Sequence, residues 1–97
     1  KMGLINQEPV INRWTGDSIT GCYVYMSDVI IAKHNLTEYK IMATFKYYYS
    51  PNARINGLEP YDVDNITKYI SSSDLPNLYA ILYTDYKTAH PNLIDEV

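Results

Sequence analysis

The sequence predicts an α+β fold, in which a small antiparallel β-sheet is joined to a C-terminal α-helix. Hydrophobic residues alternate with other residues over about 38–49, and a period of two is that of a β-strand. Residues of about 19–33 are rich in β-branched and aromatic side chains, which favour a second strand. Leucine and tyrosine recur at helical spacing over about 75–88, which indicates the helix.

The two predicted strands are expected to form an antiparallel hairpin, closed by a polar turn at residues 34–37. The alternation in the first strand breaks at Ser27-Asp28, which predicts a β-bulge or two shorter strands. One face of the second strand comprises Tyr39, Ile41, Ala43, Phe45, Tyr47 and Tyr49.

Proline and glycine define the segment that follows the hairpin. Pro51 ends the second strand, and residues 52–57 fit one helical turn that ends at Gly57, where a left-handed backbone costs little. Residues 63–70 fit either a short strand or a helical turn that begins at Asp64.

The C-terminal helix is expected to begin with Asp74 as its N-cap and Pro76 in its first turn. Pro91 ends it. Its hydrophobic face comprises Leu75, Leu78, Tyr79, Leu82 and Tyr86.

The chain is expected to form a single domain, residues 1–97, with one modest core. Residues 1–9 are interpreted as an extended N-terminal arm, and residues 10–14 as a short strand at a sheet edge, followed by a turn. Lys1 precedes Met2, as expected of an added residue or of a fragment.

The composition is that of a folded globular protein, with 46% hydrophobic and 20% charged residues. A net charge of −3 disfavours proteins that bind nucleic acid by neutralising phosphates. Residues 1–57 carry six Lys or Arg and four Asp or Glu, whereas residues 58–97 carry two and seven. This asymmetry favours head-to-tail contacts between copies or partners, or it is ordinary solvated surface.

Cys22 is the single cysteine, so the chain can form neither an internal disulfide nor a cysteine-based zinc site. We find no signal peptide and no apolar stretch long enough to span a membrane, which predicts synthesis in the cytoplasm. The two glycosylation sequons, at Asn35 and Asn65, are therefore interpreted as coincidence.

No catalytic motif is evident. His34 and His90 lack a carboxylate at zinc-motif spacing, and Asp62 and Asp64 do not fit a calcium loop. The sequence has neither a nucleophile elbow nor a glycine-rich phosphate loop. We therefore expect no enzymatic activity, no cofactor and no metal.

Eleven tyrosines in 97 residues favour a protein that recognises other macromolecules. The predicted interface residues are Trp14, Lys46 and Tyr48. Trp14 is interpreted either as a docking anchor or as a core tryptophan. Lys40 and Lys46 beside Tyr48, on the outer face of the second strand, are the candidates for nucleic-acid contact by phosphate pairing and base stacking. The alternative is that the lysines keep the strand soluble.

Residues 43–60 resemble a recurring segment in small structural proteins of tailed bacteriophages. In that segment an alternating strand runs through an aromatic residue into a turn of the form residue-x-Ala-Arg-x-x-Gly-x-x-Pro. The frequent use of Asn, Ile, Lys and Tyr in this chain also resembles that of an AT-rich phage genome. The residues that carry the resemblance are Ala43-Thr44-Phe45-Lys46-Tyr47-Tyr48-Tyr49-Ser50-Pro51-Asn52-Ala53-Arg54-Ile55-Asn56-Gly57-Leu58-Glu59-Pro60. The resemblance implies a small β-rich neck, tail or baseplate component, which forms a ring around the tail axis or an adaptor between rings. It assigns no site residues.

These observations predict a non-enzymatic structural subunit of a tailed-phage virion, which acts through contacts with other virion proteins or with copies of itself. We expect neither a small-molecule substrate nor a membrane. Two alternatives remain: a small acidic phage-encoded inhibitor of a host defence enzyme, and, less favoured, a nucleic-acid-binding β-domain.

Overall fold

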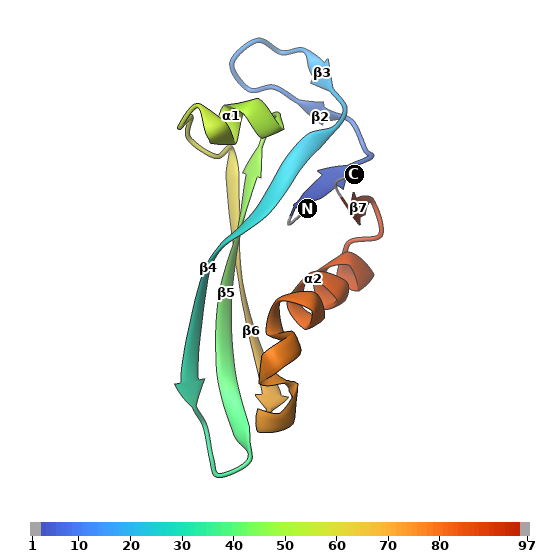
Figure 1. The fold of residues 1–97 in the computed structure, drawn as a ribbon. Helices are drawn as coiled ribbons and strands as arrows, with labels where there is room; N and C mark the ends of the chain where they lie inside the picture. Colours follow the sequence, from blue (N-terminus) through green and yellow to red (C-terminus); the bar gives the residue numbers. More distant parts are fainter. Residues whose placement is uncertain (1–2, 96–97) are drawn as a thin grey trace.

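The computed structural model describes residues 3–95 as an elongated body of 50 × 22 × 19 Å (Figure 1). A five-stranded antiparallel sheet has the order β6-β5-β4-β1-β7, and β2 and β3 form a separate pair. The α+β fold is therefore confirmed. The elements are β1 (Leu4–Asn6), β2 (Val10–Ile11), β3 (Ser18–Ile19), β4 (Cys22–Lys33), β5 (Glu38–Tyr48), α1 (Pro51–Ile55), β6 (Asp62–Ser71), the 3₁₀-helix η1 (Ser72–Asn77), α2 (Leu78–Ala89) and β7 (Leu93–Asp95).

Three long strands, β4, β5 and β6, form the framework of the molecule. The predicted hairpin is confirmed, and the register between β4 and β5 shifts between Met26 and Asp28, as expected of the bulge. At the tip of the hairpin, the Asn35 side-chain oxygen accepts the backbone N–H groups of Thr37 and Glu38 at 2.9 and 2.8 Å. The segment that fitted a strand or a helical turn is a strand, β6.

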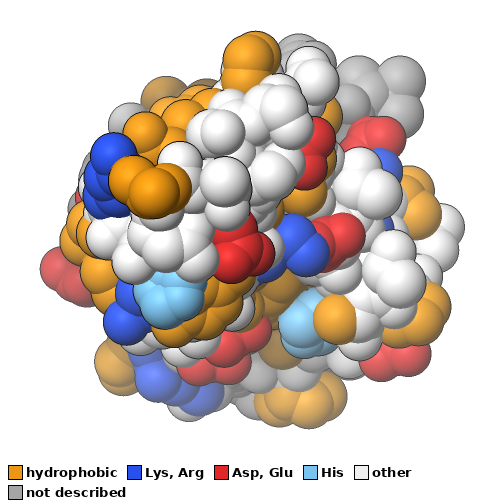
Figure 2. Space-filling model, turned by 90° about the horizontal axis from the view of Figure 1, so that it is seen from below, with side chains coloured by type: hydrophobic (Ala, Val, Ile, Leu, Met, Phe, Trp, Pro, Cys, Tyr) orange, Lys and Arg blue, Asp and Glu red, His pale blue; other side chains and the backbone are white. Residues whose placement is uncertain are grey.

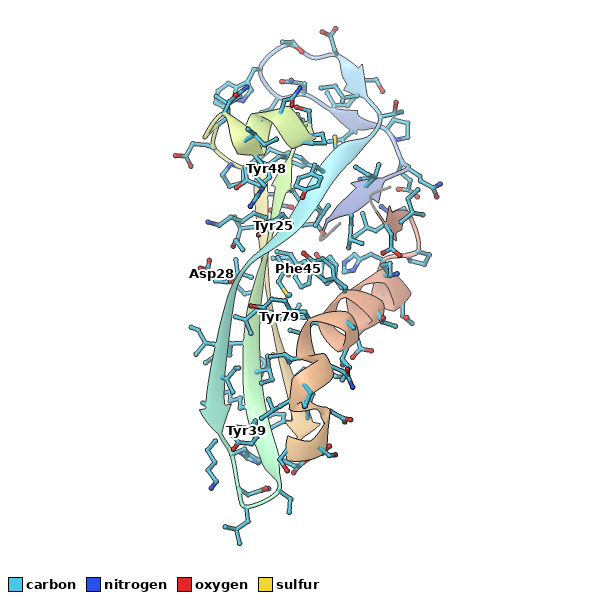
Figure 3. The ribbon with its side chains drawn as sticks, in the orientation of Figure 1. Tyr25, Asp28, Tyr39, Phe45, Tyr48 and Tyr79 are labelled. Atoms are coloured by element: carbon cyan, nitrogen blue, oxygen red, sulfur yellow. The ribbon has the colours of Figure 1, made fainter. Side chains whose placement is uncertain are left out.

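Helix α2 covers one face of this framework and encloses the core. Phe45 points from β5 toward α2 (Figure 3), where its ring stacks on Tyr86 with centroids 3.8 Å apart. The buried core comprises Leu4, Val24, Met26, Ile41, Ala43, Phe45, Ile70, Leu78, Leu82, Tyr83, Tyr86 and Leu93. The alternating residues of β5 therefore reach the core at its centre, as the period of two predicts.

The C-terminal helix differs from its prediction at its start and on its face. The 3₁₀ segment η1 precedes α2, and Asp74 accepts a hydrogen bond from the Ser71 hydroxyl at 3.0 Å instead of capping α2. Tyr79, predicted on the buried face, is 51% exposed, whereas Tyr83 is buried. A tertiary contact accompanies the burial of Tyr83, because its hydroxyl accepts the Met26 backbone N–H at 3.1 Å.

Part of the segment expected to form an N-terminal arm lies inside the sheet. Residues 4–6 form β1, which pairs with β4 on one side and β7 on the other. Residues 1–2 of the expected arm lie outside the described residues. Of the strand predicted over residues 10–14, only β2 is a strand, because a tight turn begins at Asn12. Strands β1 and β7, which are both three residues long, were not predicted from the sequence.

The turn after β5 has the predicted form. The Ser50 hydroxyl accepts the Ala53 N–H at 3.1 Å as the N-cap of α1, and Gly57 has a φ of 72°. Helix α1 lies at the upper end of the sheet (Figure 1), where the Arg54 guanidinium lies 3.6 Å above the ring of Tyr25. The face opposite α2 is thus covered at its upper end and open lower down.

Candidate docking surface

Trp14 projects from the turn between β2 and β3, and 78% of it is exposed. The side-chain oxygen of Asn12 accepts the backbone N–H groups of Trp14 and Thr15 at 2.8 and 3.3 Å. The Gly16 N–H donates to the Asn12 carbonyl at 2.7 Å, with Gly16 at a φ of 77° that suits glycine. This short Asx-type turn therefore fixes the backbone that carries Trp14.

A further hydrogen bond ties the turn to the end of β5. The Arg13 N–H donates to the Tyr49 hydroxyl at 3.0 Å, and the Tyr49 ring stacks on Tyr61 with centroids 4.4 Å apart. The Arg13 guanidinium also lies 5.2 Å from the Trp14 ring. Trp14 is thus held in a defined position relative to the main sheet.

A groove of about 450 Å³ lies between this turn and α1. Its lining combines apolar surface with a carboxylate, a guanidinium and hydroxyl groups. The lining residues are Asn12, Arg13, Trp14, Tyr49, Ser50, Ala53, Leu58 and Glu59. Ile11 on β2, Ile55 on α1 and Leu58 in the turn after α1 are exposed. Both β2 and α1 lie at the upper end of the molecule (Figure 1). We name the groove and these three residues the Trp14 surface.

The opposite end of the molecule has a different character. Seen from below in Figure 2, hydrophobic, basic, acidic and histidine side chains are intermixed on this end. Leu36, at the tip of the β4–β5 hairpin, is 90% exposed. A single exposed leucine needs no functional explanation.

The three predicted interface residues have different environments. The exposure of Trp14 excludes its alternative interpretation as a core tryptophan. Lys46 is partly exposed on the face opposite α2, where it lies in register with Tyr25 and Val63. Tyr48, expected to be exposed, is only 9% exposed, so this expectation is wrong.

Tyr48 is buried because other parts of the chain, including α1, cover the upper end of this face of the sheet. Tyr48 pairs with the buried Tyr23 of β4 and lies close to α1 (Figure 3). A buried ring cannot stack on a nucleic-acid base, so Lys46 and Tyr48 do not form the base-and-phosphate site that the sequence suggested.

The acidic residues that make the C-terminal part of the sequence negative are not gathered at one end of the molecule. Five acidic residues of the C-terminal part are distributed over β6, η1, α2 and β7, and Glu59 lies in the loop before β6. Of these elements, β6 by itself runs along most of the body (Figure 1). Two of the acidic residues form ion pairs, Asp85 with Lys68 and Asp95 with Lys87. Head-to-tail stacking by opposite poles is therefore not supported.

A polar cluster joins α2 to the sheet beneath it. The Tyr86 hydroxyl donates to an Asp64 carboxylate oxygen at 2.8 Å and also contacts the Tyr47 hydroxyl, which is left as the donor in that pair. Burial raises the pKa of Tyr86 and of Tyr47 above the ordinary tyrosine range. These hydroxyls are therefore protonated at neutral pH, and they act as hydrogen-bond donors that orient α2.

Burial likewise raises the pKa of the Cys22 thiol, which contacts Tyr61, and that of the Tyr61 hydroxyl. A thiol with a raised pKa is a poor nucleophile at neutral pH. The chemistry of Cys22 is therefore that of a small buried side chain in β4.

Both histidines are packed against aromatic rings. His34 lies edge-on to Tyr69 with centroids 4.6 Å apart, and His90 stacks on Tyr86 at 4.1 Å. Within residues 3–95, no three His, Cys, Asp or Glu side chains lie close enough together to hold a metal ion. In the same part of the chain, every helix is too short or too polar to cross a membrane.

Sequence reasoning missed most of the groove, including Arg13, Tyr49 and Leu58. The string Asn12-Arg13-Trp14-Thr15-Gly16 contains a usable signal, because asparagine followed by glycine at this spacing is typical of a tight turn. A tryptophan inside such a turn is expected to point outward. Comparison with protein-family models, curated proteins and solved structures found no match for the chain.

Proposed function

We propose that this protein is a non-enzymatic assembly subunit, which binds a partner protein through the Trp14 surface. The observation that carries the proposal is the fixed position of an exposed tryptophan. Four consecutive backbone N–H groups, those of residues 13–16, are hydrogen-bonded within the turn or to Tyr49. A chain that only needed a soluble turn at this place would not require a large indole there.

The turn that carries Trp14 is already ordered in the free protein, which lowers the entropic cost of binding a partner. A partner that covers Trp14 gains the burial of a large apolar surface, and it does not have to order the turn that carries the ring. Tryptophan and arginine are among the residues that most often dominate the energy of protein interfaces, and Arg13 lies next to Trp14. The rim groups, Asn12 and Glu59, can set orientation.

The proposed assembly is the virion of a tailed phage, at the neck, tail or baseplate. The support for this is the resemblance of residues 43–60 to small structural proteins of such phages. The same segment supplies Tyr49, Ser50, Ala53, Leu58 and Glu59 to the groove. The segment that carries the resemblance therefore lines the same groove as Trp14.

Replacing the indole tests the proposal. We expect Trp14→Ala to weaken partner binding by about 2–4 kcal/mol, roughly 30-fold to 1000-fold, because it removes the central aromatic anchor. The stability of the isolated chain should change by less than about 0.5 kcal/mol, since the side chain is exposed. Quantitative affinity capture from infected cells, followed by titration with the purified captured protein, measures the difference.

Leu36→Ala is the matched control, because Leu36 is also exposed and lies at the other end of the molecule. It should leave capture unchanged. Equal capture by wild type and Trp14→Ala would contradict the proposal. Capture of a host defence enzyme in place of a virion protein would favour the inhibitor alternative.

A further inference from the structure

Strand β6 forms one edge of the main sheet, and within residues 3–95 no strand lies on its outer side. It is ten residues long and stays in continuous register with β5, from Ser71 opposite Glu38 to Asp62 opposite Tyr47. The strand contains neither proline nor glycine. Long, regular edge strands of this kind are templates for pairing with another chain.

The hydrogen-bonding side of each β6 residue follows from the register. The Ser72 N–H donates to the Thr37 carbonyl at 2.9 Å, which continues the pairing of Ser71 with Glu38. In an antiparallel ladder the bonded residues alternate, so the even-numbered residues of β6 bond to β5. The backbone groups of Val63, Asn65, Thr67 and Tyr69 therefore face the free edge, and all four of these residues are exposed.

A second open edge, on the lower half of β4 beyond its pairing with β1, is protected. The Met26 N–H, just beyond the part of β4 that pairs with β1, donates to the Tyr83 hydroxyl. The bulge between Met26 and Asp28 follows, and Lys33 ends the strand. A bulge is a common device against strand pairing, and β6 has none in its register with β5. The two edges therefore differ in their readiness to accept a strand.

We propose that β6 pairs with β6 of a second copy of this chain, antiparallel, about a two-fold axis at Ile66. In this register Asp64 lies opposite Lys68 of the second copy, and by symmetry Lys68 lies opposite its Asp64. On the other face, Val63 meets Tyr69 of the second copy, and Asn65 meets Thr67. The strand is thus self-complementary in charge and in side-chain type.

Neighbouring registers lose this complementarity. A two-fold axis at Asn65 places Asp64 opposite Ile66, and an axis at Thr67 places Asp64 opposite Ile70 and Lys68 opposite Ile66. Only the axis at Ile66 pairs the oppositely charged residues Asp64 and Lys68, and it also overlaps nearly the whole strand. Register in a symmetric pair is set by such side-chain patterns.

A groove of about 220 Å³ runs beside this edge, between β6 and α2. Pairing through β6 would bring α2 of the second copy along this groove and cover its apolar lining. The lining residues are Ile66, Thr67, Lys68, Asp85, Tyr86, Ala89 and His90. The surface offered to the second copy is thus a strand edge together with the hollow next to it.

The pairing deepens the proposed role as an assembly subunit and rests on it, but it uses no residue of the Trp14 surface. Trp14→Ala should therefore leave the dimer intact. The two proposals fail separately, because a chain that binds a partner through Trp14 and remains a monomer refutes only the dimer.

Proline substitution on β6 and on the lower half of β4 tests the inference. Thr67→Pro removes an outward N–H and leaves the ladder to β5 intact, so we expect a monomer with an unchanged circular dichroism spectrum. Ile31→Pro is the matched control. The His34 N–H donates to the Glu38 carbonyl at 3.1 Å in the β4–β5 register, which places the Ile31 backbone at the open β4 edge. This variant should remain a dimer in sedimentation velocity.

Charge placed on the exposed face tests the register independently of proline. The double variant Asn65→Lys/Thr67→Lys sets like charges opposite each other at two symmetric positions, and it should weaken dimerisation roughly tenfold. The double variant Asn65→Glu/Thr67→Lys sets opposite charges there and should restore the wild-type dissociation constant or improve it. If Thr67→Pro fails to fold, these charge variants still test whether β6 pairs with β6 in the proposed register.

Several outcomes would overturn the inference. A wild-type chain that sediments as a monomer at high micromolar concentration removes the dimer altogether. A dimer that is insensitive to Thr67→Pro and to both charge variants uses another surface. Loss of association in Ile31→Pro as well would indicate β6-to-β4 addition, which builds open chains or rings and not a two-fold pair.

Discussion

Both faces of the β4–β5–β6 sheet carry apolar residues, but these residues are buried to different extents on the two faces. On the face toward α2, Ile41, Ala43 and Phe45 are buried. On the opposite face, below α1, Ile30 is 58% exposed and Met42 is partly exposed, beside a shallow groove of about 230 Å³. The comparison shows that the cover supplied by other elements, and not the alternation within a strand, decides which apolar residues form the core.

The largest expected effect comes from the covered face. Phe45→Ala removes a buried ring that stacks on Tyr86 and contacts Tyr83 edge-on, and it should lower the free energy of unfolding by about 3–5 kcal/mol. In a domain of this size such a loss approaches the whole stability. Urea unfolding followed by circular dichroism measures it.

Met42→Ala, at a neighbouring position of β5 on the open face, is the control for this variant. It should cost about 1 kcal/mol or less, because its side chain is already partly hydrated. Equal losses for the two variants would contradict the distinction between the faces, and would indicate that something covers the open face in solution.

Alkaline pH should lower the free energy of unfolding through Tyr83, which packs on the covered face, by an amount between those of the other variants. Burial raises the pKa of Tyr83, on the covered face, from 10.0 to about 12. Between these values the unfolded chain has lost the proton and the folded chain keeps it, so stability falls as the pH rises. The expected loss is about 1.4 kcal/mol per pH unit for such a group, and none is expected from it below its unfolded pKa.

Unfolding in urea at a series of pH values from neutral to alkaline checks this dependence. Tyr83→Phe should reduce the slope above the unfolded pKa, because it removes this buried titrating hydroxyl. A flat profile in the wild type would show that Tyr83 is accessible to hydroxide and that α2 packs more loosely than the structure indicates.

The smallest effect is expected on the open face itself. Ile30→Lys should change the free energy of unfolding by less than about 0.5 kcal/mol, because the side chain is already in water. Thermal unfolding of the two proteins compares them. A loss of several kcal/mol would mean that Ile30 is covered in the protein as it exists in solution, most simply by another chain.

Local patterns predicted the central elements well. The alternation from Tyr39 to Tyr49 identified β5, the break at Ser27-Asp28 identified the bulge, and Pro51 with Gly57 marked the helical turn that is α1. Each of these signals acts within a few residues, since it depends on backbone dihedrals, capping or side-chain period. The elements they specify do not depend on distant partners.

Distant partners explain what the sequence did not predict. β1 and β7 are too short to show a period, and their conformation depends on pairing with each other and with β4. Tyr48 has the pattern of an outward residue and is buried because other segments close over it. The groove at Trp14 likewise depends on a contact between Arg13 and Tyr49, which are far apart in the sequence.

The pairing of Leu4 with Asp95 brings together residues from nearly opposite ends of the chain. The β4–β5–β6 meander can form from neighbouring segments, but β1 reaches full pairing only after α2 has returned the chain to place β7 beside it. Such long-range closure carries the largest entropic cost and is expected late in folding. The outermost hydrogen bonds of the two terminal strands should therefore exchange with deuterium together, and sooner than those at the centre of β5.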